Sequence, residues 1–114
     1  MTAVIRRFTV LCALIAALPA AQSFAQSFVV PPDLWDRPRT GKAVLEQPVL
    51  RQAVAAAMAA PESALVIHHA GDGEAAVQAE ELRAWLMALA IDASRIRLAG
   101  DRKPREPLVV EVVK

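Results

Sequence analysis

The chain has 114 residues, 55% of them hydrophobic, and its 13 basic and 12 acidic side chains give a formal net charge of +1. This length has room for one domain. A charge so close to zero, without a run of basic residues, excludes the strongly basic surface with which proteins bind nucleic acid or anionic membranes.

Residues 1–25 have the layout of a cleavable secretory signal peptide. Arg6 and Arg7 precede an apolar run, and the small residues Ser23 and Ala25 stand at the −3 and −1 positions of a cleavage site. The apolar run is short for a membrane span, so we expect export to the periplasm, with membrane contact only through the uncleaved signal. An uncleaved N-terminal anchor is the alternative. Cleavage leaves 11 basic against 12 acidic side chains, a net charge of −1.

The only cysteine, Cys12, lies inside this apolar run. Lipoprotein processing requires a small residue before the cysteine, whereas Leu11 stands there. Residues 26–114 therefore contain no thiol for a disulfide or a cysteine metal site, and their hydrophobic core must hold the fold.

Residues 26–40 contain three prolines and no sustained hydrophobic period, which predicts an N-terminal arm that is neither a helix nor a central strand. Leu34 and Trp35 give this arm more apolar surface than a free linker needs. We expect these two side chains to pin the arm to the domain. The alternative is that Leu34 and Trp35 form a docking motif for a partner.

The first elements after the arm are a weak strand and a helix. Residues 41–47 predict the strand through Ala43, Val44 and Leu45. Pro48 suits the first turn of a helix that ends before Pro61 and is rich in alanine, a residue that favours helix.

Residues 64–98 follow the pattern of a βαβ unit. A short β-branched run ends at His68 and His69, and turn chemistry follows at residues 70–73. A helix is predicted from Glu74, and Ile96 and Leu98 then alternate with arginines as in a half-buried strand. Such a unit places its two strands parallel, with the helix on one face. The apolar stripe of this helix is predicted to contain Val77, Leu82, Trp85, Leu86 and Leu89.

The last predicted elements are a charged, solvated turn over residues 100–107 and a mostly buried strand over residues 108–113. The sequence thus predicts an α/β fold, more narrowly an α+β two-layer sandwich. Its element order is β-α-β-α-β-β, with two helices on one face of a small mixed sheet. The domain is expected to span residues 41–114, and an exposed edge on its last strand would allow pairing with another chain.

The two adjacent histidines are the main candidates for chemistry. Because neighbouring residues of a strand point to opposite faces, His68 and His69 are poorly placed to ligate one metal ion. A histidine at a strand end that satisfies a loop hydrogen bond is the simpler interpretation. His69 and Asp72 could form an acid–base pair, but no nucleophile motif accompanies them. We therefore expect no enzyme activity, no metal and no cofactor.

The arrangement over residues 41–113 resembles the OmpA-like C-terminal domain, a periplasmic module that binds peptidoglycan. The segment LVIHHAGD, which begins at Leu65, is similar to the apolar strand and Gly-His-Thr-Asp loop of the family. The helix of residues 79–96 follows the family spacing, with Ala90-Ile91 and Arg95-Ile96 at the places of the family pairs Gly-Ile and Arg-Ile. The resemblance implies a two-layer fold in which a loop aspartate and a helix arginine hold the charged end of the peptidoglycan stem peptide.

This sequence departs from the family at that site. Asp72 can stand for the loop aspartate, but Gln78 occupies the place of the arginine, and glutamine lacks the charged bidentate fork that holds a carboxylate. We therefore expect an exported, non-catalytic binding or scaffold protein that contacts a protein partner in a cell-envelope assembly. The alternative is a peptidoglycan-binding module that uses His69, Asp72 and Gln78 as an altered site.

Overall fold

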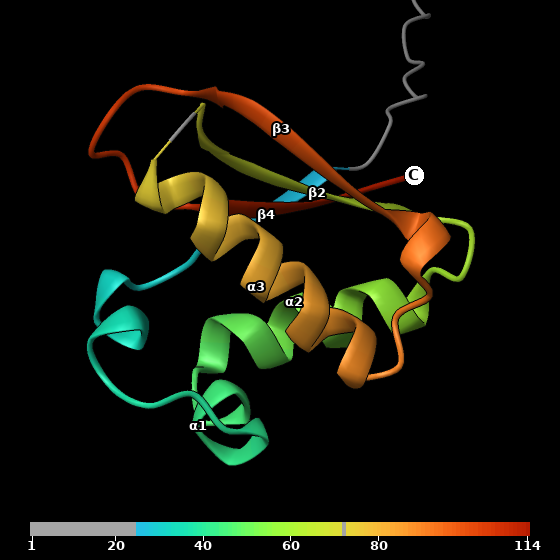
Figure 1. Ribbon diagram of the computed structural model, residues 1–114. Coiled ribbons are helices and arrows are strands. Elements are labelled where there is room, and N and C mark those ends of the chain that lie inside the picture. Colours follow the sequence, from blue (N-terminus) through green and yellow to red (C-terminus); the bar gives the residue numbers. More distant parts are fainter. Residues whose placement is uncertain (1–24, 72) are drawn as a thin grey trace, which may run out of the picture.

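Four strands form one mixed sheet in the order β1-β4-β2-β3 (Figure 1). β1 (Ala25–Val29) pairs antiparallel with β4 (Val109–Val113), which pairs antiparallel with β2 (Ala64–Ala70). β2 pairs parallel with β3 (Ile96–Arg102), as the βαβ pattern predicts. The computed structural model describes residues 25–71 and 73–114. The predicted signal peptide up to residue 24, with Cys12, lies outside the described residues, and so does Asp72.

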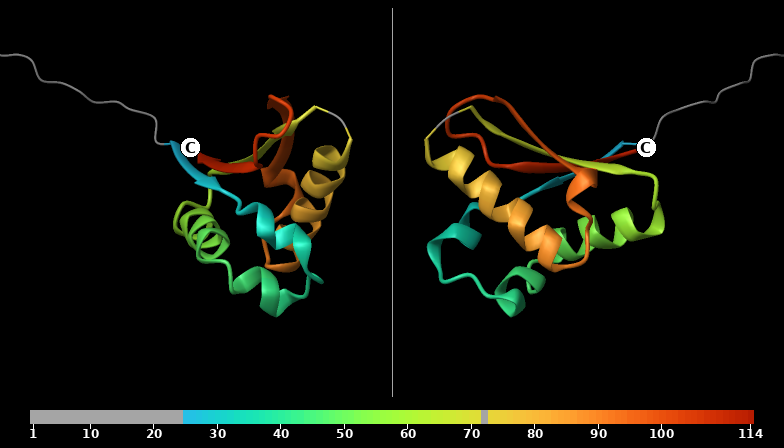
Figure 2. Two further views of the ribbon diagram at one scale, coloured as in Figure 1. Left: turned by 90° about the vertical axis from the view of Figure 1, so that its left-hand side faces the viewer. Right: turned by 45° about the vertical axis from the view of Figure 1, so that its right-hand side comes forward.

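The long helices lie on one face of the sheet and leave the other face open (Figures 1 and 2). α2 (Pro48–Ala59) packs against β1 and β4, whereas α3 (Glu74–Ala88) packs against β2 and β3. The predicted α+β two-layer sandwich with two helices on one face is therefore confirmed. No helix within the described ranges has the length and apolar character needed to cross a membrane.

The strand predicted for residues 41–47 is wrong, because these residues form a short helix, α1 (Gly41–Leu45). The Thr40 hydroxyl accepts a hydrogen bond from the backbone N–H of Ala43 at 3.0 Å and so caps the first turn. Only Val44 of this helix is buried, so one inward side chain is enough to hold it against the core.

The predicted arm of residues 26–40 contributes two elements of its own. It contains most of β1, an edge strand, and a 3₁₀ helix (Pro32–Asp36) that the sequence did not predict. Val30 and Leu34 are each 1% exposed and belong to the same core cluster as the helices. Trp35 is partly buried and packs against that cluster, so the expectation that Leu34 and Trp35 pin the arm is confirmed.

The apolar stripe of α3 differs from the predicted one at its start. Ala79, Leu82 and Leu86 are fully buried, whereas Val77 is 67% exposed. A helix that begins at Glu74 places residues 75, 79, 82 and 86 on one face, so Val77 points elsewhere. Trp85 and Leu89 are partly buried against the core, as expected.

Two further boundaries are corrected by the sheet. β3 continues to Arg102, beyond the predicted start of the solvated turn at residue 100. β4 lies between β1 and β2, so the last strand has no free edge and the sheet edges are β1 and β3. A strand paired on both sides explains why the run VVEVV is almost entirely apolar.

Candidate functional site

A pocket of about 450 Å³ lies where the arm, the start of α3 and the loop after β3 meet. We call it the Trp35–Gln78 pocket, since both residues line it. Trp35 and Asp36 come from the 3₁₀ helix, Glu74 and Gln78 from the first turns of α3, and residues 104–108 from the loop. The volume lies within the range of small-ligand sites, roughly 300–1,000 Å³. Two residues that the sequence analysis assigned to separate functions, Gln78 and Trp35, thus face one cavity.

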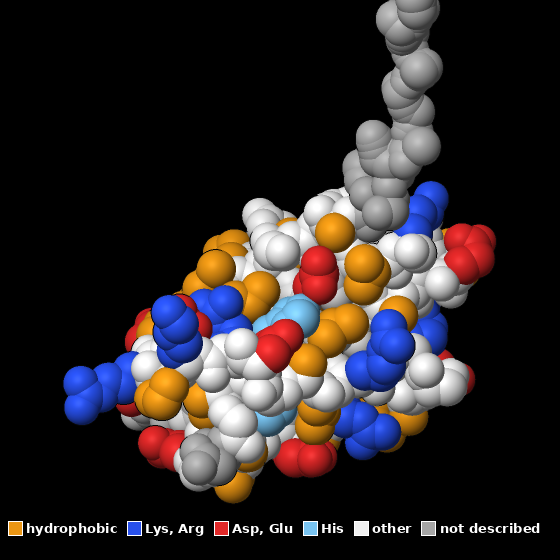
Figure 3. Space-filling model, turned by 90° about the horizontal axis from the view of Figure 1, so that it is seen from above, with side chains coloured by type: hydrophobic (Ala, Val, Ile, Leu, Met, Phe, Trp, Pro, Cys, Tyr) orange, Lys and Arg blue, Asp and Glu red, His pale blue; other side chains and the backbone are white. Residues whose placement is uncertain are grey.

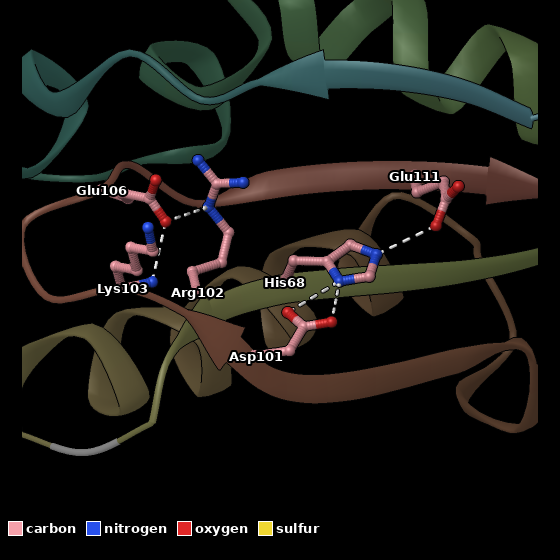
Figure 4. A network of polar contacts seen from close by, with 6 residues as sticks. All are labelled: His68, Asp101, Arg102, Lys103, Glu106 and Glu111. Carbon is pink, nitrogen blue, oxygen red and sulfur yellow. Dashed lines mark hydrogen bonds and ion pairs between the residues drawn. The ribbon is translucent and has the colours of Figure 1, made fainter.

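The loop wall of the pocket is shaped by a turn between Lys103 and Glu106. The Glu106 carboxylate accepts a hydrogen bond from the Lys103 backbone N–H at 2.7 Å, and the Glu106 N–H donates to the Lys103 carbonyl at 3.1 Å. Arg105, between them, has a positive φ of 73°. Glu106 also lies 3.7 Å from the Nε atom of Arg102, an ion pair between half-exposed side chains (Figure 4).

Arg39, which lies between the 3₁₀ helix and α1, holds Trp35 in place and ties it to α3. The Arg39 guanidinium lies 5.3 Å from the centre of the Trp35 ring, within the range of a cation–π interaction. It makes a bidentate contact with Glu81, with Nε and Nη2 donating at 2.7 and 3.0 Å, and Nη1 donates to the Trp35 carbonyl at 3.1 Å. Trp85 Nε1 donates to the same carboxylate at 3.1 Å. The Trp35 ring is therefore a preorganised wall.

The same contacts perturb the ionisation of both partners. The hydrogen bond from Arg39 is the main cause that lowers the pKa of Glu81; burial opposes it, and the Trp85 N–H supports it. The Glu81 hydrogen bond in turn raises the pKa of Arg39. Sequence analysis missed this cluster. The i,i+4 spacing of Glu81 and Trp85 was visible, but nothing in the sequence indicates a contact between residues 39 and 81.

His69 is not part of the pocket wall. It is 7% exposed on the helix-facing side of β2, and its Nδ1 atom lies 2.6 Å from the Ala70 carbonyl oxygen. This local contact fits the expected strand-end histidine. Leu34, a candidate docking residue, has its side chain in the core, so contact with a partner falls to Trp35.

His68 points to the opposite, open face, as the strand alternation predicts. Figure 3 shows a histidine on this face between acidic side chains, with hydrophobic side chains around them. The Nδ1 atom of His68 lies 2.8 Å from Asp101 of β3, and its Nε2 atom lies 2.9 Å from Glu111 of β4 (Figure 4). One imidazole thus links the three strands β3, β2 and β4. Sequence analysis missed both carboxylates, because the pairing depends on strand order and register.

The protonation of His68 follows from these contacts. Burial is the largest influence on the pKa of His68 and disfavours the charged form. Hydrogen bonds and charge attraction from Glu111 and Asp101 together outweigh burial, so the pKa of His68 is raised. Since both ring nitrogens lie against carboxylates, His68 is suited to crosslinking the three strands.

Three of the described hydroxyls have structural partners. Thr40 caps α1, Ser94 donates to Asp92 at 2.9 Å, and the buried Ser63 hydroxyl donates to the Ala60 carbonyl at 2.7 Å. Within residues 25–71 and 73–114, no group of three His, Cys, Asp or Glu side chains is arranged to hold a metal ion.

Comparison with known proteins finds no matching family model, no matching curated protein and no matching solved structure.

Proposed function

We propose that this protein is an exported, non-catalytic binding protein of the cell envelope, and that it contacts a protein partner through the Trp35–Gln78 pocket. The proposal includes an OmpA-like scaffold whose original ligand site has changed at Gln78. The observation that carries it is the pocket itself, which brings the arm and the start of α3 together around a fixed aromatic wall.

The chemistry around the pocket supports binding over catalysis. The hydroxyl groups of Thr40, Ser63 and Ser94 serve caps and helix ends, and His68 is held between two carboxylates on the other face of the sheet. Nucleophilic catalysis by a hydroxyl requires that hydroxyl within hydrogen-bond reach of a base. A concave surface with an aromatic anchor and a polar rim is instead typical of recognition.

Peptidoglycan binding remains the second candidate, because Gln78 faces the pocket. The family resemblance places its ligand-binding arginine at this position, so a glutamine here could still contact a stem peptide through its amide. An arginine would restore the charged fork that a carboxylate needs.

Photo-cross-linking in the producing cell separates these candidates. A photoreactive benzoylphenylalanine replaces Arg105, an exposed residue of the pocket lining, and a control chain carries it in place of Met58, which is 54% exposed on α2. We expect a discrete protein adduct from position 105 and none from position 58. Adducts to peptidoglycan fragments from position 105 would instead establish the second candidate.

Sedimentation with isolated peptidoglycan sacculi completes the test. The proposal expects the unaltered protein to stay in the supernatant and the Gln78→Arg variant to gain binding. Pelleting of the unaltered protein would refute the assignment to a protein partner alone.

A further inference from the structure

The charged residues that line the Trp35–Gln78 pocket are unbalanced. Among the lining residues that the structure describes, there are three carboxylates, from Asp36, Glu74 and Glu106, and one guanidinium, from Arg105. The rest of the lining is largely apolar, from the Trp35 ring and from prolines at positions 32, 104 and 107. A cavity that combines apolar walls with excess negative charge favours a ligand with an aliphatic body and a positive head group.

We propose that this pocket binds a basic side chain, Lys or Arg, of the partner protein. The inference rests on the proposed function and names the chemistry that the pocket recognises. The aliphatic stem of the side chain packs against Trp35 and the prolines, while its cationic head lies at the carboxylates.

Asp36 and Glu74 are the carboxylates assigned to the head group. Glu106 is already engaged by the Lys103 N–H and by Arg102, so its charge is partly offset. Asp36 and Glu74 are both exposed and come from different elements, the 3₁₀ helix and the first turn of α3. A head group between them would join the arm to α3, and the fixed position of Trp35 lowers the ordering cost of that contact.

The Trp35 ring is suited to a cationic ligand. It already lies against one guanidinium, that of Arg39, which shows that its π-face is in a position to receive positive charge. Arg39 is tied to Glu81 of α3 at 2.7 Å and does not line the Trp35–Gln78 pocket, so it does not occupy the place of the ligand.

Nuclear magnetic resonance titration of the protein produced from its full sequence tests the proposal. The probes are the N-acetyl methylamides of lysine and arginine, with the N-acetyl methylamides of norleucine and glutamate as neutral and acidic controls. The signals of the Trp35 indole N–H and the Gln78 amide report binding, and the Trp85 indole is an internal reference. We expect both basic probes to shift Trp35 and Gln78 at concentrations about tenfold lower than norleucine requires, and glutamate to produce no shift.

A double variant, Asp36→Asn with Glu74→Gln, assigns the head-group contacts. It should weaken binding of the lysine probe by about tenfold or more, because the charge of both carboxylates is lost at nearly constant shape. The matched control Glu62→Gln removes an exposed carboxylate outside the pocket and should leave the affinity unchanged. Circular dichroism of each variant confirms that α3 still forms.

Equal binding of the lysine and norleucine probes, or unchanged binding by the double variant, would overturn this inference. Its failure is distinguishable from failure of the proposed function. A protein adduct from position 105 with no preference for cationic probes would retain the partner and reject the basic side chain. Preference for cations without any protein adduct would support the ligand chemistry and reject the partner.

Discussion

Replacement of Ala90 by glycine should stabilise this protein, although most substitutions in a folded chain destabilise it. Ala90 ends α3 in the left-handed region, with φ of 80°. The Ile91 N–H donates to the Leu86 carbonyl and the Ala90 N–H to the Met87 carbonyl, both at 3.0 Å. These two bonds form a Schellman motif, a helix end that usually has glycine at this position.

The expected gain follows from two opposing terms. An L-residue in the left-handed region costs roughly 1–2 kcal/mol, and glycine removes most of that cost. Glycine also increases the conformational freedom of the unfolded chain, which offsets about 0.5–1 kcal/mol. Because Ala90 is exposed, loss of its methyl group costs little packing. We expect Ala90→Gly to raise the free energy of unfolding by about 0.5–1 kcal/mol.

Urea denaturation and thermal unfolding measure this change, which corresponds to a Tm increase of roughly 2–8 °C in a domain of this size. Ala84→Gly is the matched control, since Ala84 is exposed in the interior of α3 and should lose about 1 kcal/mol. The reasoning would be refuted if Ala90→Gly destabilised the protein as much as Ala84→Gly, because Ala90 would then not be left-handed in solution.

Three further predictions address the arm, the end of α2 and the histidine network. Leu34→Ala should lower the free energy of unfolding by roughly 2–5 kcal/mol in urea denaturation, because Leu34 is 1% exposed. Val77→Ala, at a 67% exposed site, should change it by less than about 0.5 kcal/mol. Similar values for the two variants would mean that the arm is not part of the core. Arg95→Met should lower the free energy of unfolding by about 2–3 kcal/mol in the same assay, because the guanidinium donates to three backbone carbonyls and to the buried Ser63 hydroxyl. A decrease below about 0.5 kcal/mol would argue against these hydrogen bonds. Because the pKa of His68 is raised on folding, its protonation stabilises the folded protein. This stabilisation should be fully present at pH values below the unfolded-state pKa of about 6.5, and it should be lost as the pH rises through the higher folded-state pKa. Unfolding measured from pH 5.5 to 9 should show this loss in the unaltered protein and not in His68→Gln, and an equal loss in both would assign it to another group.

The sequence predicted those elements whose signal is local. Pro48 and Pro61 bracket α2, and the change of hydrophobic period after residue 73 marks the start of α3. The short apolar runs before and after α3 predicted a pair of parallel strands, because two strands joined by a crossover helix normally run in the same direction. The opposite orientations of His68 and His69 followed from the alternation of a strand alone.

Other features depended on contacts between distant residues. The N-terminal strand β1 forms because β4 offers it a pairing edge, and its own sequence AQSFV carries little strand signal. The local sequence of residues 41–47 is compatible with either a strand or a helix. The side-chain cap from Thr40 and the burial of Val44 stabilise the helix.

The candidate site shows the same division. The sequence by itself determined the layer architecture, since periodicity and turn residues act within a few positions of the chain. It identified Gln78 and Trp35 as residues of interest without placing them together. Only the tertiary structure joined them in one pocket, fixed Trp35 through Arg39 and Glu81, and set His68 between Asp101 and Glu111. Such contacts depend on strand order, register and helix docking. These features are set by the packing of the whole core, because all elements must bury their apolar surfaces together.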